Sequence, residues 1–377
     1  MLKVAITLKV MIHYRINLLE RLSSNKNFNT LVLHCNSLKN SKFKNYNKPV
    51  SFKHKELFSL QYVSKKNKNL IFSPTLIYHL IKFNPDVLLL EGEANMLNNV
   101  MIFVYSILLK KPFIWWGLGL VPGMNRTPYQ KIYHPLKKIM IKKATYIIGY
   151  SSYSKEYYSQ YVNSEKILVS FNCLDDEKIR KEIKNNIDSV EHVKKKYNLQ
   201  NKKVLLFVGN LEKTKLLEKL FISFKNIKES FPSLALLIIG DGNYKKNLED
   251  IVSGLKLEDI HFTGEIIENV SRYFLAADIF ILPGRGGLAI HHALIHGLPV
   301  ISGIADGTEK DMVIENYNGF LLKTNTSEEL SEKIKYLINN NAVIKKYGLN
   351  SKKIVEERIN IQNMTNVFSY AIENSKK

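Results

Sequence analysis

The sequence predicts an α/β protein of two domains, each built on a doubly wound parallel sheet. Short apolar stretches alternate with helical ones along both halves of the chain, which is the pattern of parallel strands joined by crossover helices. The 377 residues are too many for one compact domain of ordinary size. We expect domains at residues 1–175 and 176–360, and a helix within 361–377 that packs back on the first domain.

Six apolar stretches of the first half have the length of buried strands: Leu2–Leu8, Thr30–His34, Asp86–Leu90, Phe113–Trp116, Tyr146–Tyr150 and Ile167–Ser170. The second half has five more: Val204–Val208, Ala235–Ile239, Ile260–Thr263, Ile279–Leu282 and Pro299–Ser302. The segment 175–198 is charged and helical in composition, so the domain connection is expected near its start. Ligands of such sheets bind beyond the carboxyl ends of the strands.

Most of the positive charge lies in the first half of the chain. Residues 1–175 hold 25 Lys and Arg against 8 Asp and Glu, which gives +17 of the total net charge of +21. This asymmetry favours an anionic partner, such as an acidic membrane surface or a phosphorylated acceptor, with a merely solvated surface as the alternative. No zinc, RRM-like or helix-turn-helix signature accompanies the charge, so nucleic acid is not an expected partner.

The cysteines and apolar runs restrict the location of the protein. Cys35 and Cys173 are too few for a disulfide framework and have no metal-ligand spacing, which fits a reducing compartment and no metal site. The longest apolar run, residues 100–109, is far shorter than the roughly 20 residues that span a bilayer, and we predict a buried helix there. We expect a cytoplasmic protein, and a peripheral one on the inner face of the cell membrane if the basic domain binds lipid.

Two strands of the second half end in glycine-containing turns. The first runs into Gly209 and Asn210, with Lys215 a few residues later, so backbone N–H groups and a lysine lie where a diphosphate could bind. The next strand is followed by Gly240 and Asp241 in the same design. An ordinary strand-to-helix turn is the alternative at both places.

The strongest signal is the segment DIFILPGRGGLAIHHALIHGLPVIS, residues 278–302. Its strand breaks at Pro283 into a Gly-Arg-Gly-Gly turn just before a helix. Glycines let the backbone approach a ligand, the helix start supplies N–H donors and a positive dipole end, and Arg285 adds a charge-assisted contact to phosphate. A purely structural glycine turn is the competing interpretation.

Six blocks in this half occur in a family order: FVGNL, LLIIGDGN, IHFTGEI, AADIFILPG, GLAIHHALIHGLPVIS and ENYNGFLL. Together they resemble the nucleotide-binding half of glycosyltransferase family four, and PFIWWGLG, KKATYIIGYSS and ILVSFNCLD extend the resemblance to the first half. The resemblance implies a GT-B fold, with two Rossmann-like doubly wound domains facing a central cleft. It also implies a retaining transfer from a nucleotide-diphosphate sugar, without an obligatory metal or other cofactor.

The resemblance further implies which partner each domain binds. The second domain would hold the donor, and the first a glycan or polyprenyl-diphosphate-linked acceptor of bacterial surface polysaccharide synthesis, such as O-antigen, capsule or exopolysaccharide. Lys215 falls on the family's diphosphate-binding lysine, and we predict that Lys215 and Arg285 stabilise the leaving nucleotide. The expected donor-binding residues are Gly209, Asn210, Lys215, Gly240, Asp241, Gly264, Gly284, Arg285, Gly286, Gly287, Leu288 and His292.

Four family positions carry a different residue here. Asn210 stands where the family has an arginine, Gly284 and His292 where it has two glutamates, and Leu118 where it has a histidine. A catalytically degenerate GT-B binding or scaffold subunit is therefore the alternative function. The retained glycines and Lys215 favour a transferase, because scaffolding does not require them. A dinucleotide-dependent oxidoreductase and a P-loop enzyme lack their G-x-G-x-x-G and G-x-x-x-x-G-K-[ST] motifs.

In the first domain, polar residues follow two predicted strands. Glu91 and Glu93 come after an apolar strand and are expected at its carboxyl end, where Glu91 is our catalytic candidate for orienting or deprotonating an acceptor hydroxyl. Solvated loop acids are the alternative. Trp115 and Trp116 face opposite sides of their strand, so only one can stack on a sugar. The expected acceptor-binding residues are His13, Arg15, Glu93 and Trp116.

Overall fold

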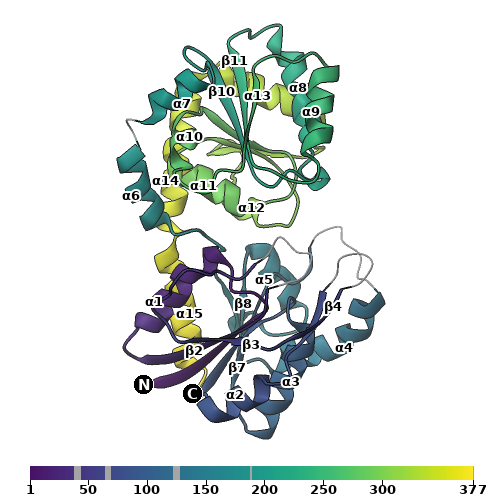
Figure 1. Cartoon of the computed structure of the whole chain (residues 1–377), viewed down its shortest axis with the longest axis vertical. Coiled ribbons are helices and arrows are strands. Elements are labelled where there is room, and N and C mark those ends of the chain that lie inside the picture. Colours follow the sequence, from purple (N-terminus) through teal and green to yellow (C-terminus); the bar gives the residue numbers. More distant parts are fainter. Residues whose placement is uncertain (38–43, 64–68, 122–127, 187–188, 377) are drawn as a thin grey trace. The chain divides into compact units, whose positions relative to one another are not determined.

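The computed structural model describes residues 1–37, 44–63, 69–121, 128–186 and 189–376. The chain divides into two compact units (Figure 1). The first contains residues 1–171 together with the segment that starts at Ile361, and the second contains Asn172–Asn360. The division therefore falls between Phe171 and Asn172, a few residues before the expected boundary at 175.

The first unit is built on a parallel sheet of seven strands in the order β3-β2-β1-β6-β7-β8-β9. All six predicted strands are confirmed. The edge strand β3 and the separate β4–β5 hairpin were missed, because their sequences are short and β3 is largely polar and exposed. The strands are β1 (Leu2–Leu8), β2 (Phe28–Cys35), β3 (His54–Leu57), β4 (Leu60–Val63), β5 (Asn69–Phe72), β6 (Val87–Glu91), β7 (Phe113–Gly117), β8 (Tyr146–Gly149) and β9 (Ile167–Val169).

The second unit has a parallel sheet of six strands in the order β12-β11-β10-β13-β14-β15. The five predicted strands are confirmed, and β15 was missed. In each sheet the order reverses once, between β1 and β6 and between β10 and β13, and such a reversal is where ligands bind in doubly wound folds. The strands are β10 (Lys203–Val208), β11 (Leu234–Ile239), β12 (Ile260–Gly264), β13 (Ile279–Leu282), β14 (Val300–Gly303) and β15 (Gly319–Leu322).

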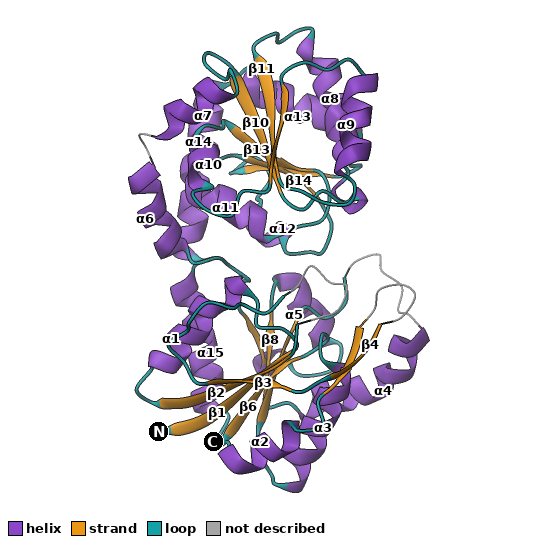
Figure 2. Cartoon of the chain, in the orientation of Figure 1, coloured by secondary structure: helices purple, strands orange, loops and turns teal. Residues whose placement is uncertain are grey.

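Helices flank both sheets (Figure 2). Those of the first unit are α1 (Ile16–Ser24), α2 (Leu76–Phe83), α3 (Met96–Leu108), α4 (Pro128–Lys143), α5 (Ser152–Ser159) and α15 (Ile361–Asn374). Those of the second unit are α6 (Asp176–Asn186), α7 (Val190–Lys196), α8 (Leu217–Lys228), α9 (Lys245–Gly254), α10 (Ser271–Leu275), α11 (Leu288–His296), α12 (Glu309–Met312), α13 (Ser327–Ile338) and α14 (Asn341–Glu357).

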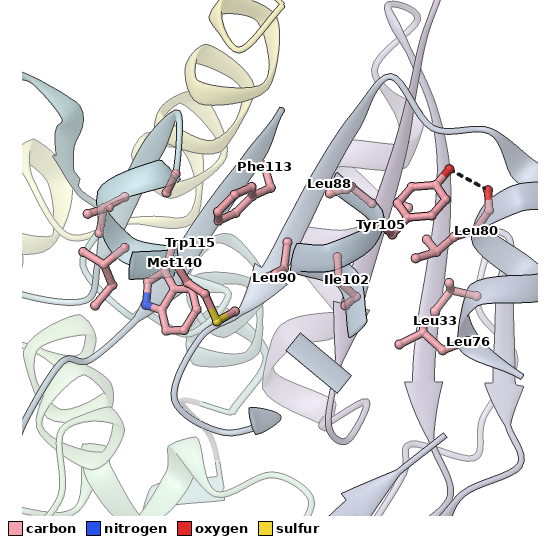
Figure 3. Close-up of a cluster of buried hydrophobic side chains, with 14 of the residues drawn as sticks. Leu33, Leu76, Leu80, Leu88, Leu90, Ile102, Tyr105, Phe113, Trp115 and Met140 are labelled. Carbon is pink, nitrogen blue, oxygen red and sulfur yellow. Dashed lines mark hydrogen bonds between the residues drawn. The ribbon is translucent and has the colours of Figure 1, made fainter. Parts of the chain in front are cut away.

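The two faces of the first sheet have separate cores. On one face Trp115 joins a large apolar cluster with residues of α2, α3 and α4, in which Tyr105 donates to the carbonyl of Leu80 at 3.3 Å (Figure 3). On the other face Trp116 packs edge-on against Phe368 of α15, with ring centroids 4.9 Å apart. Helix α15 lies beside α1 (Figure 1), so the last helix completes the core of the first unit.

One prediction for this unit was wrong. The apolar run 100–109 forms most of α3, but the helix is not buried: Val104, Ile107, Leu108 and the following Leu109 are about half exposed or more. Only the face with Ile102 and Tyr105 contacts the core. Within the described part of the chain, no helix has both the length and the apolar composition needed to cross a bilayer.

A buried histidine of α11 holds both segments that connect the second unit to the first. His291 Nδ1 accepts the N–H of Leu174 at 3.1 Å, and its Nε2–H donates to the carbonyl of Ile359 at 2.7 Å. This arrangement needs the neutral ring, because a proton on Nδ1 would face the Leu174 N–H. Burial lowers the pKa of His291 to about 4.

We expect the free energy of unfolding to fall as the pH drops from about 6.5 to about 4. In that range the unfolded state binds protons that the native His291 excludes, which costs up to about 1.4 kcal/mol per pH unit for this group. Burial lowers the pKa of His296 to about 4 as well, so it adds to the same trend. Urea unfolding across this pH range measures the slope.

The His291→Gln variant should show a shallower slope than the unmodified chain over this range. His192→Gln, at an exposed position of α7, is the matched control and should leave the slope unchanged. Equal slopes for His291→Gln and the unmodified chain would contradict the assignment.

Candidate functional site

At the strand-order reversal of the second unit, the loops that follow β10 and β13 pack backbone against backbone. A Cβ on Gly284 would lie 2.2 Å from the carbonyl oxygen of Thr214 and 2.6 Å from the Cα of Lys215. The amide of Arg285 donates to the same Thr214 carbonyl at 3.1 Å. No side chain fits at position 284 without moving a loop, so a carboxylate there would force the two loops apart.

This contact brings together the two cations that the sequence singled out. The ammonium of Lys215 donates to the carbonyl of Arg285, and the Arg285 side chain is exposed. Helix α11 starts just beyond, at Leu288, and the first N–H groups of a helix have no acceptor within it. Two cations and the positive end of a helix therefore lie at one turn, which is the chemistry that binds phosphate.

The loops after β11 and β12 lie at the same carboxyl edge of the sheet as the loops after β10 and β13. A Cβ on Gly240 would lie 1.9 Å from the carbonyl oxygen of Gly209, so these two loops are also in backbone contact. The amide of Gly240 donates to the carbonyl of Gly264 at 2.9 Å, and Asp241 is exposed beside them. The predicted donor-binding glycines thus follow four neighbouring strands at the carboxyl edge of one sheet.

Sequence reasoning missed the loop after β14. Glu309 is 1% exposed and its carboxylate accepts the N–H groups of Ala305 at 2.7 Å and Gly307 at 3.0 Å. Burial raises the pKa of this carboxyl above its ordinary value. The hydroxyl of Thr308 lies 2.6 Å from where a Cβ on Gly287 would be, so this loop packs against the start of α11. The sequence signal that could have indicated this loop is Glu309, two residues after Gly307 and shortly after the apolar strand β14.

Two of the predicted donor residues are engaged elsewhere. Asn210 donates its side-chain amide to the carboxylate of Glu212 within its own loop. His292 packs its ring against Phe274 and His296, with centroids 4.3 Å and 5.0 Å away, and its Nε2 is enclosed by protein. His292 was expected to bind the donor, but this nitrogen cannot reach a ribose or sugar hydroxyl.

In the first unit, the equivalent strand-order reversal holds an ion pair instead of a free acid. Arg15 Nη1 lies 2.5 Å from Glu91 Oε1, and the other Glu91 oxygen accepts the N–H of Lys9 at 2.6 Å. Arg15 also donates to the hydroxyl of Tyr150 at 2.8 Å, and burial raises the pKa of that phenol. Both side chains are over nine-tenths buried. We predicted that Glu91 acts as a base and that Arg15 binds the acceptor. Both predictions were wrong, because the two side chains are buried and bound to each other.

The prediction that Trp116 stacks on an acceptor sugar was also wrong. Its ring is 1% exposed and is covered by Phe368 on one side and by the Arg15 guanidinium, 4.4 Å from the ring centroid. His13, in contrast, is exposed beyond β1, with its ring edge-on to Tyr14. Of the predicted acceptor residues near β1, His13 is accessible.

Glu93 lies in a different pocket, beside β6 and β7. Its Oε1 accepts the hydroxyl of Tyr158 at 2.7 Å and is 3.5 Å from the ammonium of Lys137, while Oε2 is enclosed against Gly117. The hydroxyl of Tyr158 also accepts the indole N–H of Trp115 at 3.2 Å. The pocket has a volume of about 260 Å³ and is lined by Glu93, Met96, Leu118, Gly119, Leu120, Val121, Gln130, Tyr133, His134 and Lys137.

Leu118, where the resemblance to glycosyltransferase family four implies a histidine, lines this pocket. Its backbone carbonyl accepts the Ser154 hydroxyl at 2.9 Å, which fixes the segment after β7. In the part of the chain that the structure describes, no group of three or more His, Cys, Asp or Glu side chains is arranged to hold a metal ion.

The glycine turn, the adjoining lysine and the strand-order reversal lie in a segment that is similar to a known family. Residues 189–354 match the family model described as Glycosyl transferases group 1. This group 1 segment contains β10 to β15, and so the whole candidate phosphate site. Two solved structures share the fold over nearly all of both chains at 15% identity and a TM-score of 0.77: Anabaena Alr3699/HepE, in complex with UDP, and a glycosyltransferase from Rickettsia africae. The fold is GT-B, as predicted.

Curated relatives extend the similarity beyond the group 1 segment. The uncharacterized glycosyltransferase MJ1069 of Methanocaldococcus jannaschii is 30% identical over 230 residues, which are 59% of this chain and 57% of that protein. The match thus spans little more than half of that relative. The capsular polysaccharide biosynthesis glycosyltransferase CapM of Staphylococcus aureus is 23% identical over 83% of this chain and 89% of its own length.

We expect Gly284→Ala to destabilise the second unit by about 1–3 kcal/mol, the usual cost of adding a methyl group where none fits. It should also weaken phosphate binding, because the Thr214–Lys215 backbone must move. Gly254→Ala is the matched control: a Cβ there meets no atom within 4 Å, and the position ends helix α9. Thermal and urea unfolding measure both variants. Equal stability of Gly284→Ala and the unmodified chain would show that the loops are not in the contact described.

Proposed function

We propose that this protein is a glycosyltransferase that moves a sugar from a nucleotide-diphosphate donor to a glycan or lipid-linked glycan. The observation that carries the proposal is the turn at Gly284, where Lys215, Arg285 and the start of α11 meet. The match of residues 189–354 to group 1 glycosyl transferases supports the same conclusion. The UDP and UDP-glucose complexes of Alr3699/HepE support a nucleotide-sugar donor, since that protein shares the fold.

Sugar transfer requires positive charge near the bond between the sugar and the diphosphate of the donor. As the bond from the sugar to the diphosphate lengthens, negative charge builds on the bridging oxygen of the departing nucleoside diphosphate. Lys215, Arg285 and the N–H groups at the start of α11 would stabilise that charge by preorganised electrostatics. In this proposal they supply the positive charge in place of a metal ion or other cofactor.

The acceptor would bind in the first unit, in the pocket that Glu93 and Lys137 line. The lining of this pocket combines polar groups from α4 with apolar ones from the segment after β7. Such a mixed lining suits a sugar, which presents hydroxyl groups at its edge and C–H groups on its face. Exposed His13 is a second candidate contact, at the end of β1.

We propose membership of glycosyltransferase family four and transfer with retention. Glu91 is tied up in its ion pair, so the leaving phosphate would accept the proton of the acceptor hydroxyl on the same face of the sugar. Similarity to CapM suggests a surface polysaccharide as the product, with capsule as the first candidate. NMR of the product decides the stereochemistry, and an inverted anomeric centre would refute this mechanism.

A catalytically inactive GT-B subunit is the second candidate. It is favoured by Gly284, where packing forbids the family's carboxylate, and by His292, which faces the protein interior. Such a subunit would bind nucleotide without turning it over. A thermal-shift panel of UDP, GDP, ADP, CDP and their sugar conjugates, followed by donor-turnover assays with the stabilising nucleotide, separates the two functions.

We expect Lys215→Ala to lower the turnover of the donor by about 10²–10³-fold, the effect of removing one donor to a developing anion. The same variant should lose most of the thermal stabilisation by the preferred nucleoside diphosphate. Arg285→Ala should act in the same direction. Lys213→Ala is the matched control, since Lys213 is an exposed lysine of the same short turn.

Stabilisation of the unmodified chain by no nucleotide would refute the donor site itself. Normal turnover in Lys215→Ala and Arg285→Ala would instead show that the protein is a transferase in which other groups stabilise the leaving nucleoside diphosphate.

A further inference from the structure

The first unit exposes an unusual amount of apolar surface along two neighbouring helices. Tyr78 and Ile81 of α2 are each 61% exposed, and Leu108 of α3 is 74% exposed. Val104, Ile107 and the following Leu109 are about half exposed. Monomeric proteins rarely leave so many large apolar side chains together in water, and such clusters usually mark an interaction surface.

These side chains border a groove between the two helices. It has a volume of about 440 Å³ and its lining is apolar except for one tyrosine. Neither α2 nor α3 contains an acidic residue. The lining residues are Ile77, Ile81, Val100, Met101, Val104, Tyr105, Leu108 and Leu109. We refer to this groove and its exposed borders as the α2–α3 face.

A basic cavity adjoins the α2–α3 face. It has a volume of about 600 Å³ and shares Leu109 with the groove. Four lysines line it, Lys110, Lys111, Lys143 and Lys376, and Asp86 is the one acidic residue among its lining. Asp86 is already bound, because its carboxylate accepts from Lys376 at 3.0 Å and from the N–H of residue 3 at 2.9 Å.

Among the described residues, the other three lysines are not ion-paired, although Lys111 helps to lower the pKa of Asp86. Lys110, Lys111 and Lys143 form no ion pair with a carboxylate in the described part of the chain. An anionic bilayer surface has two layers, an inner one of acyl chains and an outer one of phosphates. The apolar groove matches the acyl chains, and the adjoining lysines match the phosphates. The net charge of +17 on residues 1–175 adds a long-range attraction to such a surface.

We propose that the α2–α3 face docks on an anionic phospholipid membrane. Ile81, Val104, Ile107 and Leu108 enter the boundary between headgroups and acyl chains, and Lys110, Lys111 and Lys143 bind lipid phosphates. A second copy of the chain fits this surface less well, because neither α2 nor α3 offers an acidic residue to pair with the lysines of another copy. The proposal stands independently of the proposed function, since it concerns binding and not turnover.

The test is co-sedimentation of the full chain with phosphatidylcholine vesicles, with and without phosphatidylglycerol. The unmodified chain should bind only the vesicles that contain phosphatidylglycerol, and binding should weaken as salt is added. Leu108→Asp should reduce binding about tenfold or more, because it puts a charge in place of an inserted leucine. Neutralising Lys110 and Lys111 to Gln should reduce it about fivefold for each lysine.

Matched controls separate this surface from general charge and exposure. Leu349→Asp changes an exposed leucine of α14 that is 69% exposed, and Lys194→Gln with Lys195→Gln removes two charges from α7. Both controls should bind as the unmodified chain does, and melting temperatures confirm that every variant is folded.

Two results would overturn the proposal. One is equal binding of Leu108→Asp and Leu349→Asp to the anionic vesicles, which would place the docking surface elsewhere. The other is an absence of vesicle binding combined with a dimer in light scattering that Leu108→Asp dissociates, which would make the α2–α3 face an interface between copies.

Discussion

The backbone contact between Gly284 and the Thr214–Lys215 segment is the constraint on which the second unit's site depends. It joins the loops of β10 and β13, the two strands between which the sheet reverses its order. Because the loops touch through backbone atoms, the Cα of Lys215 is fixed beside Gly284, and from there its ammonium donates to the carbonyl of Arg285. The resemblance to glycosyltransferase family four would put a carboxylate at this position, and the packing leaves no room for one.

At the strand-order reversal of the first unit, between β1 and β6, the loops are joined by side chains. There the Arg15–Glu91 pair joins the loop after β1 to the end of β6, and Tyr150 and the N–H of Lys9 add further hydrogen bonds to it. Removing one partner of this buried ion pair would leave an uncompensated charge. Glu93 and Lys137 line a separate pocket of this unit.

The sequence sufficed for the central strands, because buried parallel strands are continuous apolar runs such as VLLLE and LALLII. The edge strands β3 and β15 were missed, since HKEL is largely polar and GFLL begins with a glycine. The location of Lys215 and Arg285 at one turn also followed from strand ends and glycines.

What sequence reasoning could not supply was the direction and engagement of side chains. Glu91 is at the expected end of its strand, yet its chemistry depends on an arginine 76 positions earlier in the chain. Trp116 is on the expected strand, yet the last helix covers it. The run 100–109 is apolar enough for a core, and only the packed structure reveals that one side of α3 has no cover.

The return of α15 to the first unit has a consequence for biosynthesis. The second unit, Asn172–Asn360, is continuous in sequence and is complete before α15 leaves the ribosome. The first unit is interrupted by the second, and Phe368 reaches Trp116 only after the second unit has been translated. The first sheet therefore lacks part of its core until α15 is synthesised, and until then the nascent chain carries an uncovered indole beside the charges of Arg15 and Glu91.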